Sequence, residues 1–324
     1  MPDIVSAIIW IFNTLTLTSL VVSVLTIFLP IRSGHARRIL ATLRPLLIFG
    51  ILCICACAYH VFWFSMLPYW DLAPLSLLWN THVTIATTTM LHTVWNYVFC
   101  VIIDPAAVEL TNGAGAAPAR HCSHCDRHIV NLDHHCPMTG GCIGEHNFRY
   151  FALFLLYSWL GSGYACAISW RPYRECVLDY SPDALYSPDL PEFPQACVIL
   201  GARATLLLSA AACFVCLGSL SLLHALLAAN GLTTLHLHKD WRKRGCSVLA
   251  DLVLFRAEPR CDKWAMVWGE PNATRLRVLG VLVIPSRPRR SALPFMTTVA
   301  PFGAARTEAC DVASGSGRTK RLRE

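Results

Sequence analysis

Long unbroken runs of apolar residues divide this chain, and polar stretches of very different composition separate them. A helix needs roughly 20 residues to cross a bilayer. Apolar runs of about this length or longer occupy 4–29, 46–67, 79–103, 150–170 and 204–228. A water-soluble domain would instead alternate apolar and polar positions with a period of about 2 or 3.6 residues. The pattern therefore predicts an all-α multispanning membrane protein of about five helices.

Composition agrees with this prediction, because 55% of the 324 residues are hydrophobic and only 15% are charged. The basic residues gather beside the spans: segment 31–45 has four arginines and no acid, and the tail after 230 is also basic. Lys and Arg beside spans are typical of the cytoplasmic side of a membrane. Both segments are therefore expected in the cytosol, with the N-terminus outside. The net charge of +7 then reflects membrane topology and not nucleic-acid binding.

The spans and polar stretches together predict four parts. These are an N-terminal membrane region 1–103, a cysteine-rich domain 104–149, a C-terminal membrane region 150–229 and a basic tail 230–324. The cysteine-rich domain and the tail are expected to be cytosolic. Because the cytosol keeps thiols reduced, close cysteine pairs there favour metal binding over disulfides. We expect the second part to be a small zinc-stabilised β-hairpin domain.

The stretch HCSHCDRHIVNLDHHCPMTGGC, at 121–142, holds four cysteines and five histidines. Zinc in proteins takes four ligands, chiefly thiolate and imidazole, in a tetrahedron. Cys122 and Cys125 form a C-x2-C pair, a spacing that lets two thiolates point at one ion. The stretch therefore predicts a zinc site that begins with these two cysteines.

Two sets of residues compete for the remaining two ligand positions. Cys136 and Cys142 would complete an all-thiolate site that is purely structural. His135 and Cys142 would complete a mixed site and leave Cys136 free. His134 could then take the thiol proton, while Asp133 holds that imidazole in one tautomer. A nucleophile, a base and an orienting carboxylate form the general arrangement for covalent catalysis. Only the mixed site gives Asp133 and His134 a role, but the spacing alone leaves the choice open.

Three segments, DHHCP at 133–137, CIG at 142–144 and HNFRYF at 146–151, resemble the DHHC-type protein S-acyltransferases, or palmitoyltransferases. DP at 104–105 and GLTTLH at 231–236 resemble the elements that flank the family domain. The resemblance implies a multi-pass membrane protein of the Golgi or endoplasmic reticulum whose active site faces the cytosol. It also implies ping-pong transfer of a long-chain acyl group, palmitoyl, from acyl-CoA to protein cysteines.

Carried over residue by residue, the resemblance makes Cys136 the nucleophile that becomes the acyl-enzyme thioester. His134 would be its base, Asp133 would orient His134, and Thr234 would support Asp133. The zinc ligands that it implies are Cys122, Cys125, His135 and Cys142. The implied partners are acyl-CoA, protein substrates with membrane-proximal cysteines, and membrane lipid, with no nucleic acid.

The chain also departs from the family pattern. The family has a second zinc site built partly from a C-x2-C pair, but segment 108–119, where that pair is expected, contains no cysteine or histidine. His121 and His128 match ligand positions of that site, and two imidazoles alone would hold zinc poorly, so we expect one Zn²⁺ site. Met138 replaces a tryptophan, and His236 replaces a glutamate. These departures leave an alternative function, a catalytically inactive zinc-containing membrane scaffold that binds partner proteins.

Overall fold

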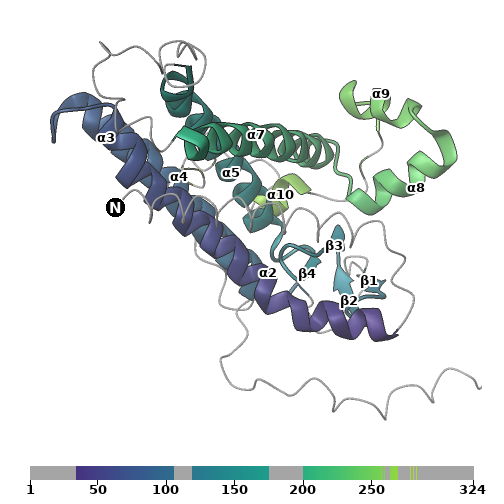
Figure 1. The fold of residues 1–324 in the computed structure, drawn as a ribbon. Coiled ribbons are helices and arrows are strands. Elements are labelled where there is room, and N and C mark those ends of the chain that lie inside the picture. Colours follow the sequence, from purple (N-terminus) through teal and green to yellow (C-terminus); the bar gives the residue numbers. More distant parts are fainter. Residues whose placement is uncertain are drawn as a thin grey trace, which may run out of the picture. The chain divides into compact units, whose positions relative to one another are not determined.

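The computed structural model describes residues 34–105, 119–174, 200–257, 259, 263–268, 278, 280 and 282 (Figure 1). All of them belong to one compact unit, Met1–Leu293. The second unit, Pro294–Glu324, contains none of the described residues. The first predicted span, at 4–29, also lies outside the described residues.

In the described part of the chain, four helical segments are long and apolar enough to cross a membrane. They are Arg44–Tyr69, Leu77–Ile102, Phe148–Tyr173 and Leu207–Ala229. Each overlaps a span predicted from the apolar runs of the sequence. The prediction of a multispanning helical membrane protein is thereby confirmed.

The first described helical segment is longer than its apolar run. Helix α2 (Gly34–Val61) continues directly into the π-helix η1 (Phe62–Met66) and then α3 (Leu67–Tyr69). The basic segment 31–45, which precedes the apolar run 46–67, is helical from Gly34 onward. Its alanines, leucines and arginines are all strong helix formers, and this explains the extension beyond the apolar run.

Three further long helices, α4 (Leu77–Ile102), α5 (Phe148–Tyr173) and α7 (Leu200–Ala229), complete the bundle. Helix α5 packs against both α4 and α7. Gly218 of α7 makes part of the second contact possible, because a Cβ there would lie 2.6 Å from Nε1 of Trp159. A residue without a side chain thus lets these two helices approach closely, as small residues do between membrane helices.

Two antiparallel hairpins lie between α4 and α5 in the sequence. In the first, β1 (Ala119–Cys122) pairs with β2 (Arg127–Val130), and in the second, β3 (His134–Cys136) pairs with β4 (Gly141–Ile143). The backbone N–H of Glu145, just after β4, donates to the carbonyl of Val130 at 3.1 Å, which joins the hairpins. The predicted small β-hairpin domain is therefore present.

Asn147 fastens the hairpins to the helical bundle. Its side-chain amide donates to the carbonyl of Cys100, near the end of α4, at 3.2 Å and to that of Cys142 at 2.9 Å. Its Oδ1 accepts from the backbone N–H of Gly144 at 2.9 Å. Tyr97 of α4 adds a second link, since its hydroxyl donates to the carbonyl of Met138 at 2.9 Å. The second hairpin is thus held at the ends of α4 and α5.

Among the described residues after the bundle are the short helices α8 (Thr234–Arg244), α9 (Ser247–Val253) and α10 (Lys263–Trp268). Thr233 caps α8, with its hydroxyl accepting from the backbone N–H of His236 at 3.2 Å. Helix α10 packs against α5 and α7. The chain beyond the last span therefore returns to the bundle, close to where the second hairpin is attached.

Candidate metal centre and reactive cysteine

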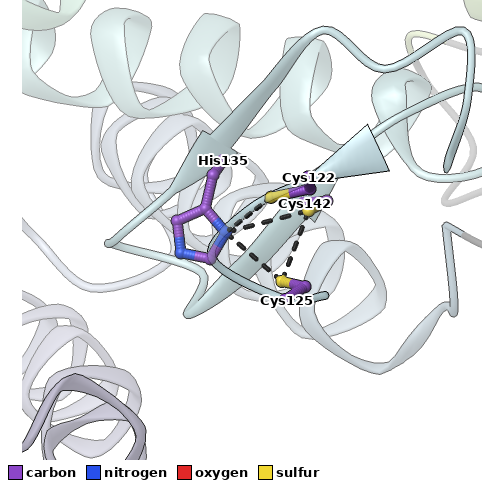
Figure 2. A group of neighbouring side chains, drawn as sticks. All are labelled: Cys122, Cys125, His135 and Cys142. Atoms are coloured by element: carbon purple, nitrogen blue, oxygen red, sulfur yellow. Dashed lines mark hydrogen bonds between the residues drawn. The ribbon is translucent and has the colours of Figure 1, made fainter. Parts of the chain in front are cut away.

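Four side chains from the two hairpins converge on one point, as Figure 2 shows. Nδ1 of His135 lies 3.8, 3.3 and 3.7 Å from the sulfurs of Cys122, Cys125 and Cys142. The sulfurs of Cys125 and Cys142 are 3.4 Å apart. A tetrahedral zinc ion, with bonds of about 2.3 Å to sulfur and about 2.0–2.1 Å to nitrogen, separates its ligand atoms by about 3.6–3.8 Å. The residues therefore fit zinc in both chemistry and spacing.

The register of the second hairpin explains why His135 and Cys142 share this site. The two residues stand directly opposite each other in the β3–β4 pair. Residues opposite each other across two strands project to the same face of the sheet. The first hairpin supplies the other two ligands, since a tight turn follows Cys122, whose carbonyl accepts from the N–H of Asp126 at 2.8 Å. Cys125 lies within this turn.

The neighbours of His135 lie on the other face of β3. Successive side chains of a strand point to opposite faces, so His134 and Cys136 point away from the metal cluster. Cys136 is buried in an apolar cluster that contains Phe148 and Phe151 of α5. The converging ligand group contains His135 and does not contain Cys136. The all-thiolate site that the spacing left open is therefore not the arrangement of this structure.

His134 links Cys136 to Asp133. Nδ1 of His134 donates to Oδ2 of Asp133 at 2.7 Å, and the imidazole lies close enough to Cys136 for each group to shift the pKa of the other. Burial alone would raise the pKa of Cys136, but the hydrogen bond and charge of His134 hold it below its ordinary value. Burial lowers the pKa of His134, but the hydrogen bonds to Asp133 and Cys136 outweigh this effect and raise it to about 9. The three residues are arranged as nucleophile, base and orienting carboxylate.

Asp133 is completely buried and accepts several hydrogen bonds. Thr234, at the start of α8, donates from its hydroxyl to Oδ2 at 2.6 Å and from its backbone N–H to Oδ1 at 3.0 Å. Nζ of Lys263 in α10 also donates to Oδ1. Burial alone would raise the pKa of Asp133, but the hydrogen bond from His134 and the charge of Lys263 hold it well below its ordinary value. The carboxylate is thus fixed in its charged form.

Sequence reasoning placed Thr234 beside Asp133 but missed two other neighbours. Nδ1 of His224 in α7 lies 3.9 Å from Oδ2 of Asp133, and Lys263 contacts the other carboxylate oxygen. A histidine within an apolar span is itself a signal of function, so His224 could have been singled out. Lys263 carries no such signal, because it stands among the other basic residues of the tail.

The residues that depart from the family pattern also have defined places. His121 is partly exposed, with Nε2 3.1 Å from Oδ1 of Asp126, and its ring lies 5.1 Å from that of His128. Over the described residues, two groups of side chains are close enough together to hold a metal, the four-ligand cluster and the trio of Asp133, His134 and His224. His121 and His128 belong to neither group. His236 completes the capping box of α8, since its Nδ1 accepts from the backbone N–H of Thr233 at 3.2 Å, and its Nε2 lies 2.7 Å from the guanidinium of Arg120. Met138 packs at the edge of the apolar cluster around Cys136.

A helical membrane bundle that carries a small Cys/His metal-binding domain beside its spans defines the class of this protein. Within that class, residues 110–240 match the DHHC palmitoyltransferase family. This part of the chain is therefore similar to DHHC palmitoyltransferase domains, and the resemblance drawn from the sequence is confirmed.

Individual relatives match over shorter stretches. Palmitoyltransferase ZDHHC7 of Mus musculus is 44% identical over 59 residues, which is 18% of this chain and 19% of the relative. Palmitoyltransferase ZDHHC9 of Homo sapiens is 55% identical over 38 residues, 12% of this chain and 10% of the relative. Palmitoyltransferase ZDHHC17 of Danio rerio is 38% identical over 71 residues, 21% of this chain and 11% of the relative. The matches thus span a fifth or less of the length of these relatives.

Proposed function

We propose that this protein is a protein S-acyltransferase that transfers a long-chain acyl group, such as palmitoyl, from acyl-CoA to cysteines of other proteins. One observation carries the proposal. Cys136 lies on the strand face opposite the metal cluster and is paired with His134, which Asp133 holds in turn. A purely structural metal module needs neither a free thiol at this position nor a base beside it. The relatives described above are all palmitoyltransferases, which agrees with this chemistry.

The reaction runs in two thioester exchanges. In the first, His134 takes the thiol proton, and the Cys136 sulfur attacks the carbonyl carbon of the acyl-CoA thioester. The bond from that carbon to the CoA sulfur breaks, and the proton leaves with CoA as its thiol. In the second, a substrate cysteine loses its proton to His134 and attacks the acyl-enzyme, and Cys136 leaves and regains the proton. A covalent intermediate of this kind gives ping-pong kinetics.

Asp133 keeps His134 in the orientation and tautomer that this proton transfer requires. Its hydrogen bond to Nδ1 of His134 fixes the tautomer, so that the other ring nitrogen is left to accept the thiol proton. Thr234 holds both carboxylate oxygens. Zinc bound by the four converging ligands would hold β3 in place and supply no step of the reaction.

The membrane-spanning bundle suits this substrate. Each methylene of an acyl chain gains about 0.8 kcal/mol on burial, so a long chain needs an extended apolar surface. The apolar cluster that buries Cys136 includes residues of α4 and α5, so the sulfur stands next to such a surface. The positive-inside rule supports a cytosolic position for the hairpins, where the polar CoA group remains in water. We infer that the protein works in the Golgi or endoplasmic reticulum with its active site facing the cytosol.

Acyl labelling tests the proposal directly. Cells that express the full chain are given an alkyne-bearing palmitate, and the purified protein is examined for a label that hydroxylamine removes. We expect the wild type to be labelled and Cys136→Ser to remain unlabelled, with equal zinc content in both. Equal labelling of both proteins would place the acyl group elsewhere and contradict the proposal. An unlabelled wild type that contains zinc would favour the scaffold function instead.

A further inference from the structure

Lys263 differs from the other basic residues that follow the last span. Arg242 and Lys243 at the end of α8 are exposed, as expected for charges that face water or a membrane surface. Lys263 is completely buried, with 0% of its surface exposed. An ammonium group loses its hydration at such a position, which is unfavourable unless a partner compensates. The neighbours of Lys263 therefore have to offset the free-energy cost of burying its charge.

The partner of Lys263 is the buried carboxylate of Asp133. Nζ donates to Oδ1, and the same nitrogen lies 3.9 Å from the centre of the Phe148 ring, at the start of α5. Hydrogen bonds between charged groups are shorter and stronger than neutral ones. The aromatic face adds a favourable interaction with the cation. A residue more than a hundred positions away in the sequence thus reaches the centre formed by the hairpin.

The hydrogen bonds to Asp133 divide evenly between its two oxygens. Oδ2 accepts from His134 and from the hydroxyl of Thr234, whereas Oδ1 accepts from the backbone N–H of Thr234 and from Lys263. Two donors on each oxygen fix the plane of the carboxylate. Without Lys263, Oδ1 would keep only one of these donors in a site that excludes water. The carboxylate could then rotate away from Nδ1 of His134.

The packing of helix α10 places the Lys263 side chain beside Asp133. Val267, one turn after Lys263, is buried in the same apolar cluster as Phe148 and Phe151 of α5. Helix α10 also packs against α7. The apolar contacts of the helix thus hold its first residue over the carboxylate.

We propose that Lys263 is a positioning residue for acyl transfer, one that holds Oδ1 of Asp133 so that Oδ2 stays aligned with His134. This inference rests on the proposed acyltransferase function. Lys263 touches neither Cys136 nor the acyl group in this scheme, and it acts only through Asp133. It also balances the charge of the carboxylate with a group that takes no part in proton transfer.

The test measures single-turnover acylation of purified full-length protein in detergent, at a series of palmitoyl-CoA concentrations. Lys263→Met removes the charge and keeps the length of the side chain. Groups that support metal ligands typically contribute 10-fold to 100-fold, and we expect a comparable fall in the rate at saturation for Lys263→Met. The palmitoyl-CoA concentration at half-saturation should not change. Lys239→Met, at an exposed lysine of α8, is the matched control and should keep the wild-type rate.

A second comparison separates positioning from a general loss of structure. In an Asp133→Asn background, adding Lys263→Met should cause no further loss of rate, because the carboxylate that Lys263 holds is already gone. Losses that multiply in the double variant would overturn the inference, since Lys263 would then act independently of Asp133.

Chemical rescue covers the case in which Lys263→Met folds poorly or loses zinc. Lys263→Ala leaves space for a small amine, and ethylammonium should restore part of its rate, whereas ethanol should not. Absence of rescue would overturn the inference, as would a wild-type rate in Lys263→Met. A wild type that takes up no acyl group would instead overturn the proposed function, and this inference with it.

Discussion

The two faces of the β3–β4 hairpin serve different purposes and are completed in different ways. The metal face carries His135 and Cys142 and is completed by two cysteines of the neighbouring hairpin, all within 21 residues of sequence. The opposite face carries His134 and Cys136 and is completed by Thr234 of α8 and Lys263 of α10. One face is therefore assembled locally, whereas the other depends on the return of the chain after the last span.

The contrast shows how one short strand can contribute to a metal site on one face and to a thiol with its base on the other. A metal ion needs four ligands at fixed distances, which two adjacent hairpins supply by themselves. A reactive thiol needs a base, an orienting group and a dry apolar wall, which together require several elements of the fold. The alternation of side chains along β3 separates these two environments by a single residue step.

Loss of one metal ligand should have the largest effect, because it breaks both faces at once. Cys125→Ser leaves three ligands for the ion, so we expect loss of zinc and of the acyl label together. Metal analysis and acyl labelling on the same preparation measure both quantities. Cys136→Ser serves as the matched control, since it should lose the label and keep zinc. Loss of zinc in that control would make Cys136 a ligand and remove the distinction between the faces.

Asp133→Asn should affect the reactive face alone. The amide has the same shape but can present its NH₂ group to His134, and this favours the wrong tautomer. In serine proteases the equivalent change lowers kcat by roughly 10⁴. We expect a loss of about 10³–10⁴ in the rate of acyl-enzyme formation, measured in single turnover, with zinc retained. A variant within tenfold of the wild type would show that the carboxylate does not orient the base.

Thr234→Val should have a smaller effect on the same face. It removes the hydroxyl donor to Oδ2 of Asp133 and keeps the backbone donor to Oδ1. We expect the acylation rate to fall by about 10-fold to 100-fold, the range typical of supporting groups. Thr234→Ser, which retains the hydroxyl, is the control and should restore most of the rate. Equal rates in the valine and serine variants would contradict a role for the hydroxyl.

Gly140→Ala should test the turn that joins the two strands of the hairpin. Gly140 has a backbone φ of +62°, a value that residues with a side chain rarely adopt. An added Cβ would also overlap the side chain of Arg44 in α2. Such backbone strain typically costs about 1–3 kcal/mol. We expect a lower midpoint of thermal unfolding, measured in detergent with zinc bound. Gly245→Ala is the control, since it has a similar φ but no atom within 4 Å of the added Cβ. Equal shifts would assign the effect to the backbone alone.

His121→Ala should have the smallest effect. His121 is partly exposed and stands on the first hairpin, apart from the four converging ligands. We expect one zinc per chain in both the variant and the wild type, measured by metal analysis after dialysis against a weak chelator. Two zincs in the wild type and one in the variant would show that the first hairpin builds a second metal site.

The sequence was sufficient where structure follows from neighbouring residues. Apolar runs predicted the described spans, because length and hydropathy alone decide whether a helix can cross a bilayer. The ligand set stayed open on spacing alone, since His135 and Cys136 are adjacent. Only the register of β3 against β4 shows that His135, and not Cys136, stands opposite Cys142.

Contacts between distant segments could not be predicted in this way. Lys263 is one basic residue among several in the tail, and only the packing of α10 against α5 and α7 separates it from the exposed ones. His224 stands in an apolar span, where its sequence neighbours say nothing about Asp133. Asn147 was part of a recognised segment, but its bonds to two separate carbonyls depend on how α4 ends beside the hairpin.

The hydrogen bonds of Asn147 also determine where the Cys136 sulfur lies along the axes of α4 and α5. These bonds tie the hairpin to the ends of two long helices and so define its position along the helix axes. Under the proposed function, a protein substrate has to bring its own thiol to that level. Distance from the bilayer, more than the sequence around the thiol, would then decide which cysteines are served.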